Sequence, residues 1–265
     1  MAGRRVRRWW LAAALPWVGI LAVAGTWMVG VGGAAPAERT PQRAVRVARL
    51  ASPMVQSLAR PTATIPVLWV LTPAGPNGLT IYSAPDGAPS AALPAQDELG
   101  SPLVLLATAR HGDWFQALLP SRPNGATGWI RATDVVASAP TYRVEVSRAA
   151  HQLKVIRLTD GAVVLTSVVG VGSASTPTPA GEFFIRDLFP TGTMNHPYGP
   201  FAFGLSGHSD VLMHFGTGDG RIAIHGTNQP GSIGADQSNG CVHVPNDFDL
   251  TLIPLLSLGT PVVIS

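Results

Sequence analysis

Short runs of alternating apolar and polar residues, interrupted by glycine and proline, constrain the fold of this chain more than any other feature. Residues 142–147 and 152–158 are two such runs. The Thr-Asp-Gly sequence that follows the second run is a hairpin signal, and the mostly apolar residues 163–169 are expected to form the returning strand. Alternation of this kind is typical of half-buried strands. The chain also carries 29 Gly and 24 Pro among 265 residues and lacks long amphipathic helical patterns. These features predict a mainly β protein, with room for about two domains of roughly 100–150 residues.

The N-terminal part differs from the rest in composition. Residues 1–8 include four Arg, and residues 9–35 carry no charge. That apolar run exceeds the core of about 7–15 residues in a cleavable signal and reaches the roughly 20 residues that span a membrane. Small residues at its end would still permit cleavage. We predict a signal anchor or signal peptide over 1–36, followed by an Arg-, Ala- and Pro-rich linker over 37–63.

Basic residues are concentrated in this N-terminal arm. Residues 1–60 hold nine Arg and one acidic residue, whereas residues 61–265 hold nine basic and fourteen acidic residues, a net charge of −5. Because arginines precede the apolar run, we predict that the rest of the chain lies outside the cytoplasm, anchored to the cytoplasmic membrane or secreted. The acidic remainder argues against nucleic acid as a partner, and the N-terminal segment is expected to contact the membrane.

Residues 64–139 contain short strand candidates separated by Pro, Gly and Asp turns, which predicts a small barrel. Three stretches resemble bacterial SH3-like domains, namely Tyr-Ser-Ala-Pro-Asp at 82–86, His-Gly-Asp-Trp-Phe at 111–115 and Gly-Trp-Ile at 128–130. The resemblance implies an SH3-like module over residues 64–139. Its aromatic residues, such as Trp114 and Trp129, either belong to the core or line a groove that binds the cell wall.

A single cysteine, Cys241, lies between two histidines, and it cannot form a disulfide within the chain. His225 follows the apolar run 222–224, so we expect it at a strand end, while the small residues 238–240 form a turn that presents the thiol. A thiolate is the nucleophile of cysteine enzymes, and a nearby imidazole generates it at neutral pH. The glycines beside His225 and Cys241 let the backbone approach a substrate and direct amides at an oxyanion.

The order of these residues is that of a known signature. His-Gly-Thr begins at His225 and Ser-Asn-Gly-Cys ends at Cys241, 16 positions later. Residues and spacing resemble the L,D-transpeptidase catalytic domain (YkuD-like), and Thr-Pro-Thr-Pro-Ala-Gly-Glu-Phe at 176–183 resembles a loop of the same family. The resemblance implies a mostly-β catalytic sandwich with short helices over residues 140–265.

The family resemblance also implies a role for individual side chains. Cys241 is expected to attack an acyl donor, His225 to act as its base, and the Gly226 carbonyl to orient His225. The other expected site residues are Gly240 and Asn239 as oxyanion donors, and Ser238, His243, His208 and His214 as substrate contacts.

Two positions depart from the family pattern. Asn239 stands where the family often has His, and His243 stands where it usually has Arg. Neither change removes the nucleophile or the base, but the second bears on how a substrate carboxylate is held. Residues i and i+2 of a strand share a face, so His243 is expected beside Cys241. It replaces the Arg as a carboxylate or backbone partner, has a structural role, or acts as a second base.

The resemblance, rather than the residues alone, supplies the substrate. It implies peptidoglycan tetrapeptide stems as partners, release of the terminal D-alanine, and a thioester on Cys241 that is passed to an acceptor amine. No cofactor is implied. Carbapenem-type inhibitors are expected to acylate the same thiol, because a strained lactam mimics the acyl donor.

Other functions stay open at this point. Cys241, His243 and His225 would supply three zinc ligands, although the glycine-rich turn favours access over closure, and we predict no metal. A papain-like peptidase places its Cys before the catalytic His, the reverse of the order here. A catalytically weak wall-binding protein and a wall-peptide cysteine hydrolase are the remaining alternatives to a transpeptidase.

Overall fold

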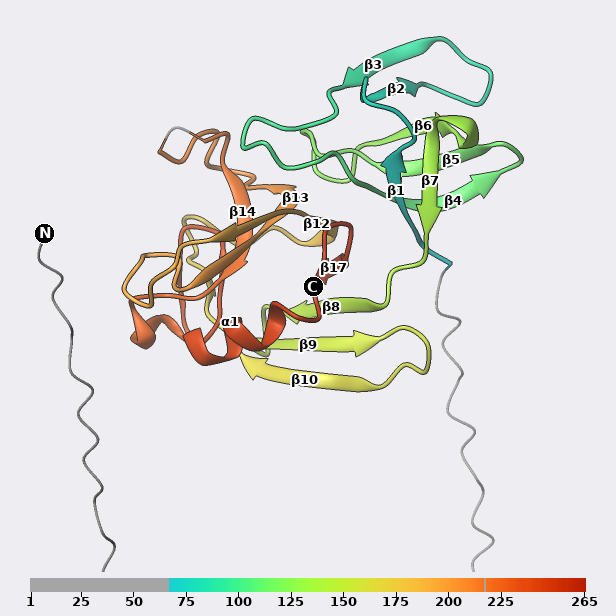
Figure 1. Ribbon diagram of the computed structural model, residues 1–265. Coiled ribbons are helices and arrows are strands. Elements are labelled where there is room, and N and C mark those ends of the chain that lie inside the picture. Colours follow the sequence, from blue (N-terminus) through green and yellow to red (C-terminus); the bar gives the residue numbers. More distant parts are fainter. Residues whose placement is uncertain (1–66, 217) are drawn as a thin grey trace, which may run out of the picture. The chain divides into compact units, whose positions relative to one another are not determined.

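A computed structural model of the chain describes residues 67–216 and 218–265 (Figure 1). The predicted signal segment over 1–36 and the predicted linker over 37–63 therefore lie outside the described residues. Within the described ranges, no helix is both long and apolar enough to span a membrane. Strands dominate there, and the α-helix α1 (Asn246–Leu252) has only seven residues. The predicted mainly β fold with short helices is thus confirmed for this part of the chain.

The first sheet is antiparallel and is built from seven strands in the order β3-β2-β6-β5-β4-β1-β7. The strands are β1 (Trp69–Pro73), β2 (Leu79–Tyr82), β3 (Pro89–Leu93), β4 (Leu105–His111), β5 (Trp114–Leu118), β6 (Thr127–Arg131) and β7 (Val135–Ser138), with the 3-10 helix η1 (Ala132–Asp134) before β7. Leu71, Ile81 and Ile130 are fully buried on one face, as strand alternation requires. An SH3-like identity for this module stays a prediction.

The two tryptophans singled out in this module have different surroundings. Trp114 is buried, with its ring edge-on to Tyr82 at 5.0 Å between centroids. Trp129 is half-buried, and its ring lies 5.4 Å from that of His111. Trp114 therefore belongs to the packed interior, while Trp129 keeps part of its ring accessible.

The second sheet has eight strands in the order β10-β9-β8-β17-β12-β13-β14-β16, and a two-stranded sheet pairs β11 with β15. The strands are β8 (Tyr142–Ser147), β9 (Gln152–Arg157), β10 (Val163–Val168), β11 (Val171–Gly172), β12 (Gly181–Pro190), β13 (Phe201–His208), β14 (Arg221–His225), β15 (Asp236–Ser238), β16 (Val242–His243) and β17 (Pro261–Ile264), with the 3-10 helix η2 (Pro230–Ser232). The hairpin expected from the Thr-Asp-Gly signal is present as the β9–β10 pair, with Gly161 at φ 71°.

Strand β12 connects the two halves of the second sheet. Residues 181–184 pair with β17, and after a bulge beyond Ile185 the strand continues beside β13. Bulges bend a strand and increase its twist, so the two halves contribute to one apolar core. That core contains side chains from both halves, among them Val144, Leu153, Phe203 and Ile224. It holds in place the strands on which the site is built.

Apolar packing continues from the second sheet into the first, since the described residues belong to one compact unit. Phe183 and Phe184 are adjacent on β12 and point to opposite faces. Phe183 packs in the core of the second sheet, whereas Phe184 is fully buried in the core of the first. A Cβ atom on Gly259 would lie 2.3 Å from Val70 Cγ1, so glycine is needed where the backbone of residue 259 packs against the Val70 side chain.

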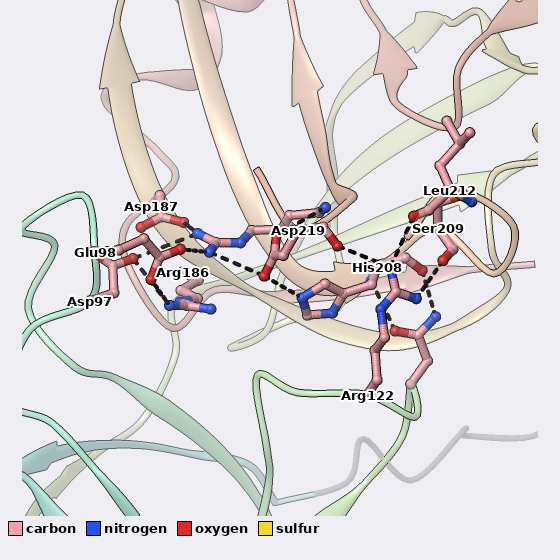
Figure 2. A network of polar contacts seen from close by, with 11 residues as sticks. Asp97, Glu98, Arg122, Arg186, Asp187, His208, Ser209, Leu212 and Asp219 are labelled. Atoms are coloured by element: carbon pink, nitrogen blue, oxygen red, sulfur yellow. Dashed lines mark hydrogen bonds and ion pairs between the residues drawn. The ribbon is translucent and has the colours of Figure 1, made fainter. Parts of the chain in front are cut away.

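Polar contacts accompany this packing (Figure 2). Arg122 donates to three carbonyl oxygens, those of Ser209, Leu212 and Asp219, at 2.6, 3.0 and 3.0 Å. The side-chain amide of Asn124 donates to the carbonyl of His208 and accepts from its backbone amide. The first sheet therefore supports the segment that leads into β14.

Candidate active site

Strands β14 and β16 place the predicted nucleophile near the predicted base. They are parallel neighbours, with Ile224 opposite Val242 and His225 opposite His243. Ile224 and Val242 are fully buried in the apolar core, so the alternate residues point to the other face. There His225, His243 and Cys241 line a cleft of about 800 Å³, and the two imidazole rings lie 4.7 Å apart between centroids. The structure thus brings these three predicted residues together.

The turn before the thiol is closed by its own serine. Ser238 Oγ donates to the Cys241 carbonyl at 2.6 Å and accepts from the Gly240 amide at 3.1 Å. Gly240 has φ of 111°, in a region that favours glycine. The Gly240 amide is therefore engaged within the turn, contrary to the expectation of an oxyanion donor, and Ser238 shapes the turn although it also borders the cleft. Within the described residues, the Cys241 amide has no acceptor. Asn239 is exposed and lines the cleft.

The His225 ring is oriented by the next residue, as expected. Its Nδ1 atom lies 2.5 Å from the Gly226 carbonyl oxygen. A carbonyl only accepts, so the proton of the neutral ring sits on Nδ1 and the lone pair on Nε2. A Cβ atom on Gly226 would lie 2.4 Å from Asn246 Oδ1 and 2.8 Å from Pro200 Cδ. Glycine is thus required at this position for steric reasons as well.

Burial sets the protonation of the pair. It lowers the pKa of His225 to about 3, with a smaller contribution from His243. It also raises the pKa of the Cys241 thiol to about 11, against a smaller opposing effect from the Ala223 backbone. Both shifts favour the neutral thiol and the neutral imidazole. The preformed thiolate expected from the sequence is therefore disfavoured, and the proton has to move during nucleophilic attack.

Among residues 67–216 and 218–265, His243 has no ionised partner that would make it a cation. Its Nδ1 atom is 2.8 Å from Ser232 Oγ, and burial lowers the pKa of the ring. A neutral imidazole cannot replace the charge of an arginine toward a carboxylate. The expectation that His243 holds a substrate carboxylate by charge is thus not supported by its surroundings.

The two other histidines expected to contact substrate do not line the cleft. His208 is buried, and its Nε2 atom is 2.9 Å from Asp219 Oδ2 (Figure 2). Asp219 itself borders the cleft. His208 therefore influences the cleft only indirectly, through its contact with the Asp219 carboxylate. His214 is exposed and lies outside the lining. The structure therefore places neither side chain in the lining of the cleft, because strand register and the course of residues 209–216 decide which side chains face it.

One part of the cleft is charged and includes residues of the first module. Glu98 and Leu99, from the segment before β4, line it together with Asp187 and Arg221. Arg221 Nη1 lies 2.5 Å from Asp187 Oδ2, and its Nη2 contacts Glu98. Burial raises the pKa of Asp187 to about 6, and a hydrogen bond with Asp97 adds to this. Sequence reasoning missed these residues, because their contacts join segments far apart in the chain, Asp97 and Glu98 with Asp187 and Arg221.

Tyr198 and Asp249 are further residues without a predicted role. The Tyr198 ring meets His225 edge-on at 4.8 Å between centroids, and burial, followed by the charge of Cys241, raises its pKa. Asp249 of α1 is fully buried, and its Oδ2 accepts from the Phe201 amide at 3.0 Å. Burial raises the pKa of Asp249 to about 7. The only sequence signal was a carboxylate within an otherwise apolar helix face.

In the part of the chain that the structure describes, no group of three or more His, Cys, Asp or Glu side chains is arranged to hold a metal ion. The site offers instead a thiol, two imidazoles, and a backbone amide, that of Cys241, without an acceptor among the described residues. Such a set is able to attack a carbonyl carbon and to carry a proton between nucleophile and leaving group.

Comparison with known sequences gives a consistent picture. Residues 141–264 match the L,D-transpeptidase catalytic domain family (YkuD). The YkuD protein of Bacillus licheniformis is 33% identical over 157 residues, which cover 57% of this chain and 86% of that protein. The YkuD protein of Bacillus subtilis is 34% identical over 126 residues, covering 47% and 66%.

The solved structures similar to this chain include L,D-transpeptidases. The enzyme from Mycobacterium smegmatis is 14% identical with a TM-score of 0.39, covering 74% of this chain and 99% of that one. An Enterococcus faecium L,D-transpeptidase is 17% identical with a TM-score of 0.38, covering 57% and 74%. A structure of LdtMt1 in complex with imipenem is 17% identical with a TM-score of 0.38, covering 76% and 88%.

Proposed function

Because the chain belongs to the L,D-transpeptidase (YkuD) family, we propose that it is a peptidoglycan L,D-transpeptidase with Cys241 as nucleophile and His225 as base. The observation that carries this proposal is the register of β14 and β16, which turns His225, His243 and Cys241 into one cleft. The Gly226 carbonyl supports the role of His225, since it leaves the lone pair on Nε2.

In the first half-reaction, Cys241 Sγ attacks the carbonyl carbon of the diamino acid residue, at its peptide bond to the terminal D-alanine of a tetrapeptide stem. The thiol proton passes to His225 Nε2 as the S–C bond forms. The C–N bond to the terminal D-alanine then breaks, and the imidazolium of His225 returns the proton to the leaving amine. A thioester remains on Cys241. The neutral starting pair favoured by burial is compatible with proton transfer that accompanies attack.

The developing oxyanion needs donors that are not already used. Gly240 donates its amide to Ser238, so the Cys241 amide is the best remaining backbone donor. Asn239 stays a proposed second contributor, because it is exposed at the cleft. Loss of one such donor typically costs about 10²–10³-fold in rate.

The first module and the N-terminal segment have proposed roles as well. The seven-stranded sheet is an SH3-like module whose Glu98 and Leu99 shape the cleft. The uncharged segment 9–35 keeps the catalytic domain outside the cytoplasm, where the stems are. A reporter that is active only in the cytoplasm, fused after Ser265, is expected to be inactive; activity would contradict this location.

The direct test is incubation of the full-length protein with a disaccharide-tetrapeptide, followed by mass spectrometry of protein and products. We expect release of D-alanine, a thioester on Cys241 and a cross-linked or amine-exchanged stem. Release of D-alanine with only a free tripeptide stem would indicate the hydrolase. Absence of both adduct and product would indicate a wall-binding protein without activity. Cys241→Ala is the control, because it removes the nucleophile.

A further inference from the structure

Ser232 fixes the position of the proton on the His243 ring. Ser232 is buried in η2, with its Oγ 2.7 Å from the Gln229 carbonyl oxygen and 2.8 Å from His243 Nδ1. A carbonyl only accepts, so the single hydroxyl proton is directed at Gln229. The hydroxyl must then accept from His243, which places the proton of the neutral ring on Nδ1. The lone pair is left on Nε2, and no hydrogen bond occupies that atom within the described residues.

Three elements hold the His243 ring in this orientation. Its backbone amide and carbonyl both pair with Gly170, at 2.9 Å each. A Cβ atom on Gly170 would lie 2.1 Å from the Ser232 carbonyl oxygen and 3.4 Å from His243 Cβ, so this corner is closely packed. On the other side, the ring stacks at a tilt on His225. The open Nε2 atom therefore belongs to a fixed ring at the wall of the cleft.

The groups packed around His243 do not favour its charged form. From β14 it faces His225, and along its own segment it follows Cys241, both neutral at rest. β15 contributes Asp236, whose carboxylate is engaged with His151 at 2.8 Å. β11 and η2 contribute no titratable side chain. Burial lowers the pKa of His243, so the ring is a neutral acceptor at neutral pH.

We propose that His243, with its tautomer fixed by Ser232, is the proton acceptor for the incoming amine in the second half-reaction. The inference rests on the proposed transpeptidase function. It divides the work between two imidazoles: His225 serves the thiol during acylation, and His243 serves the acceptor during aminolysis. Both histidines line the same cleft and have an Nε2 atom without a hydrogen bond among the described residues, and each has its Nδ1 proton bound by a separate partner, Gly226 or Ser232.

The proposed step balances without a further reactant. The neutral amine nitrogen attacks the thioester carbon, the N–C bond forms, and one amine proton passes to His243 Nε2. The C–S bond then breaks, and Cys241 leaves as a thiolate. The imidazolium of His243 returns the proton to the thiolate, either directly or through neighbouring His225. The products are an amide and the free thiol, so both histidines end neutral.

The test separates the two half-reactions in the full-length protein and its variants. Acylation by a carbapenem and by the disaccharide-tetrapeptide is followed by intact mass, and the thioester is then exposed to an amine of low basicity across pH. For His243→Gln we expect aminolysis to fall by roughly 10²–10⁴-fold, with acylation lowered by no more than about tenfold. His214→Gln makes the same change at an exposed histidine outside the cleft and is the matched control.

A second variant tests the tautomer itself. Ser232→Ala removes the hydroxyl, so long-range ¹H–¹⁵N spectra should show His243 changing from a single Nδ1–H form to a mixture, together with slower aminolysis. A pure Nδ1–H form that persists in Ser232→Ala would overturn the role of Ser232. Unchanged aminolysis in His243→Gln, with normal acylation, would overturn the proposal and leave the proposed function intact. Absence of acylation in the wild type would instead reject the proposed function, and this inference with it.

Discussion

The two modules of the described chain bury different kinds of residue. In the first, the residues buried from Leu71 to Val135 are apolar, and the side chain of Asp97, 8% exposed beside Arg186 and Arg221 of the second module, is the polar exception. In the second, polar or charged residues from Thr178 to Thr260 are also buried, His225 and Asp249 among them. Burying a polar group costs free energy unless it is hydrogen-bonded. This unfavourable burial is found mainly in the second module. The first module contributes apolar packing and, through Glu98 and Leu99, part of one wall of the cleft.

This difference indicates which part of the chain contains functional residues. A core that is entirely apolar is explained by folding alone. Buried imidazoles and carboxylates with partners such as Gly226 and Phe201 are costly to maintain, and the His225 imidazole lines the same cleft as the single thiol. Substitutions in the first module should therefore affect stability, and substitutions around the cleft should affect chemistry first. Variants in both parts of the chain would show whether this contrast holds.

The largest effect is expected from loss of the base. His225→Ala should lower acylation of Cys241 by roughly 10²–10⁴-fold, because the thiol proton loses its acceptor. Acylation by a carbapenem, followed by intact mass in the full-length protein, measures this. The acylation rate of the wild type should also stay constant in mildly acidic solution. Burial lowers the pKa of His225 to about 3, so the ring stays in its base form there. A wild-type rate that falls around the ordinary imidazole pKa of about 6.5 would contradict this picture.

The next effect concerns stability and the first module. Phe184→Ala should lower the free energy of unfolding by about 3–5 kcal/mol, because the ring is fully buried in the core of the first sheet. Phe189→Ala is the matched control on the same strand, since Phe189 is 48% exposed. Urea denaturation of both variants makes the comparison. Equal losses would show that β12 does not insert into the first core as described.

A smaller, pH-dependent effect is expected at Asp249. Its folded pKa of about 7 lies above the unfolded value of about 3.9, so the native state binds more protons between these values. The stability it contributes is present at low pH and is lost as pH rises toward 7. The free energy of unfolding of Asp249→Asn should therefore exceed that of the wild type by on the order of 1–3 kcal/mol between about pH 5 and pH 8. Asp247→Asn, exposed on the same helix, should show no such trend; a parallel trend would refute the assignment.

The smallest effect is expected at the charged rim. Glu98 contacts Arg221 and Arg186, but its side chain is 61% exposed. Exposed ion pairs contribute about 0–1 kcal/mol, so Glu98→Gln should change the free energy of unfolding by less than about 1 kcal/mol. Denaturation at low and high salt measures it. A larger, salt-resistant loss would mean that the two modules depend on this pair rather than on apolar packing.

Local sequence patterns were sufficient for the parts of the molecule that depend on neighbouring residues. The Thr-Asp-Gly turn predicted the β9–β10 hairpin, and His225 was expected at a strand end, where β14 in fact ends. The Gly226 carbonyl was expected to orient His225, and the 2.5 Å contact agrees with this. In each case the partner lies within a few residues along the chain.

The remaining features depend on which segments meet in space. Phe183 and Phe184 point to opposite faces of β12, as neighbouring strand residues do, but no local sequence pattern indicates that they enter different cores. His208 and His214 looked equivalent in the sequence, and only the folded path makes one buried and the other exposed. Ser232 gave no signal, because its role follows from a contact with a residue eleven positions away.

The central claim is that Cys241, rather than any other group, carries the acyl chain, and intact mass spectrometry of the full-length protein with a carbapenem tests it most directly. The account predicts one added lactam per chain, located by peptide mapping on the peptide that contains Cys241, and no addition to Cys241→Ala. Folded wild type that stays unmodified, or equal labelling of Cys241→Ala, would contradict it.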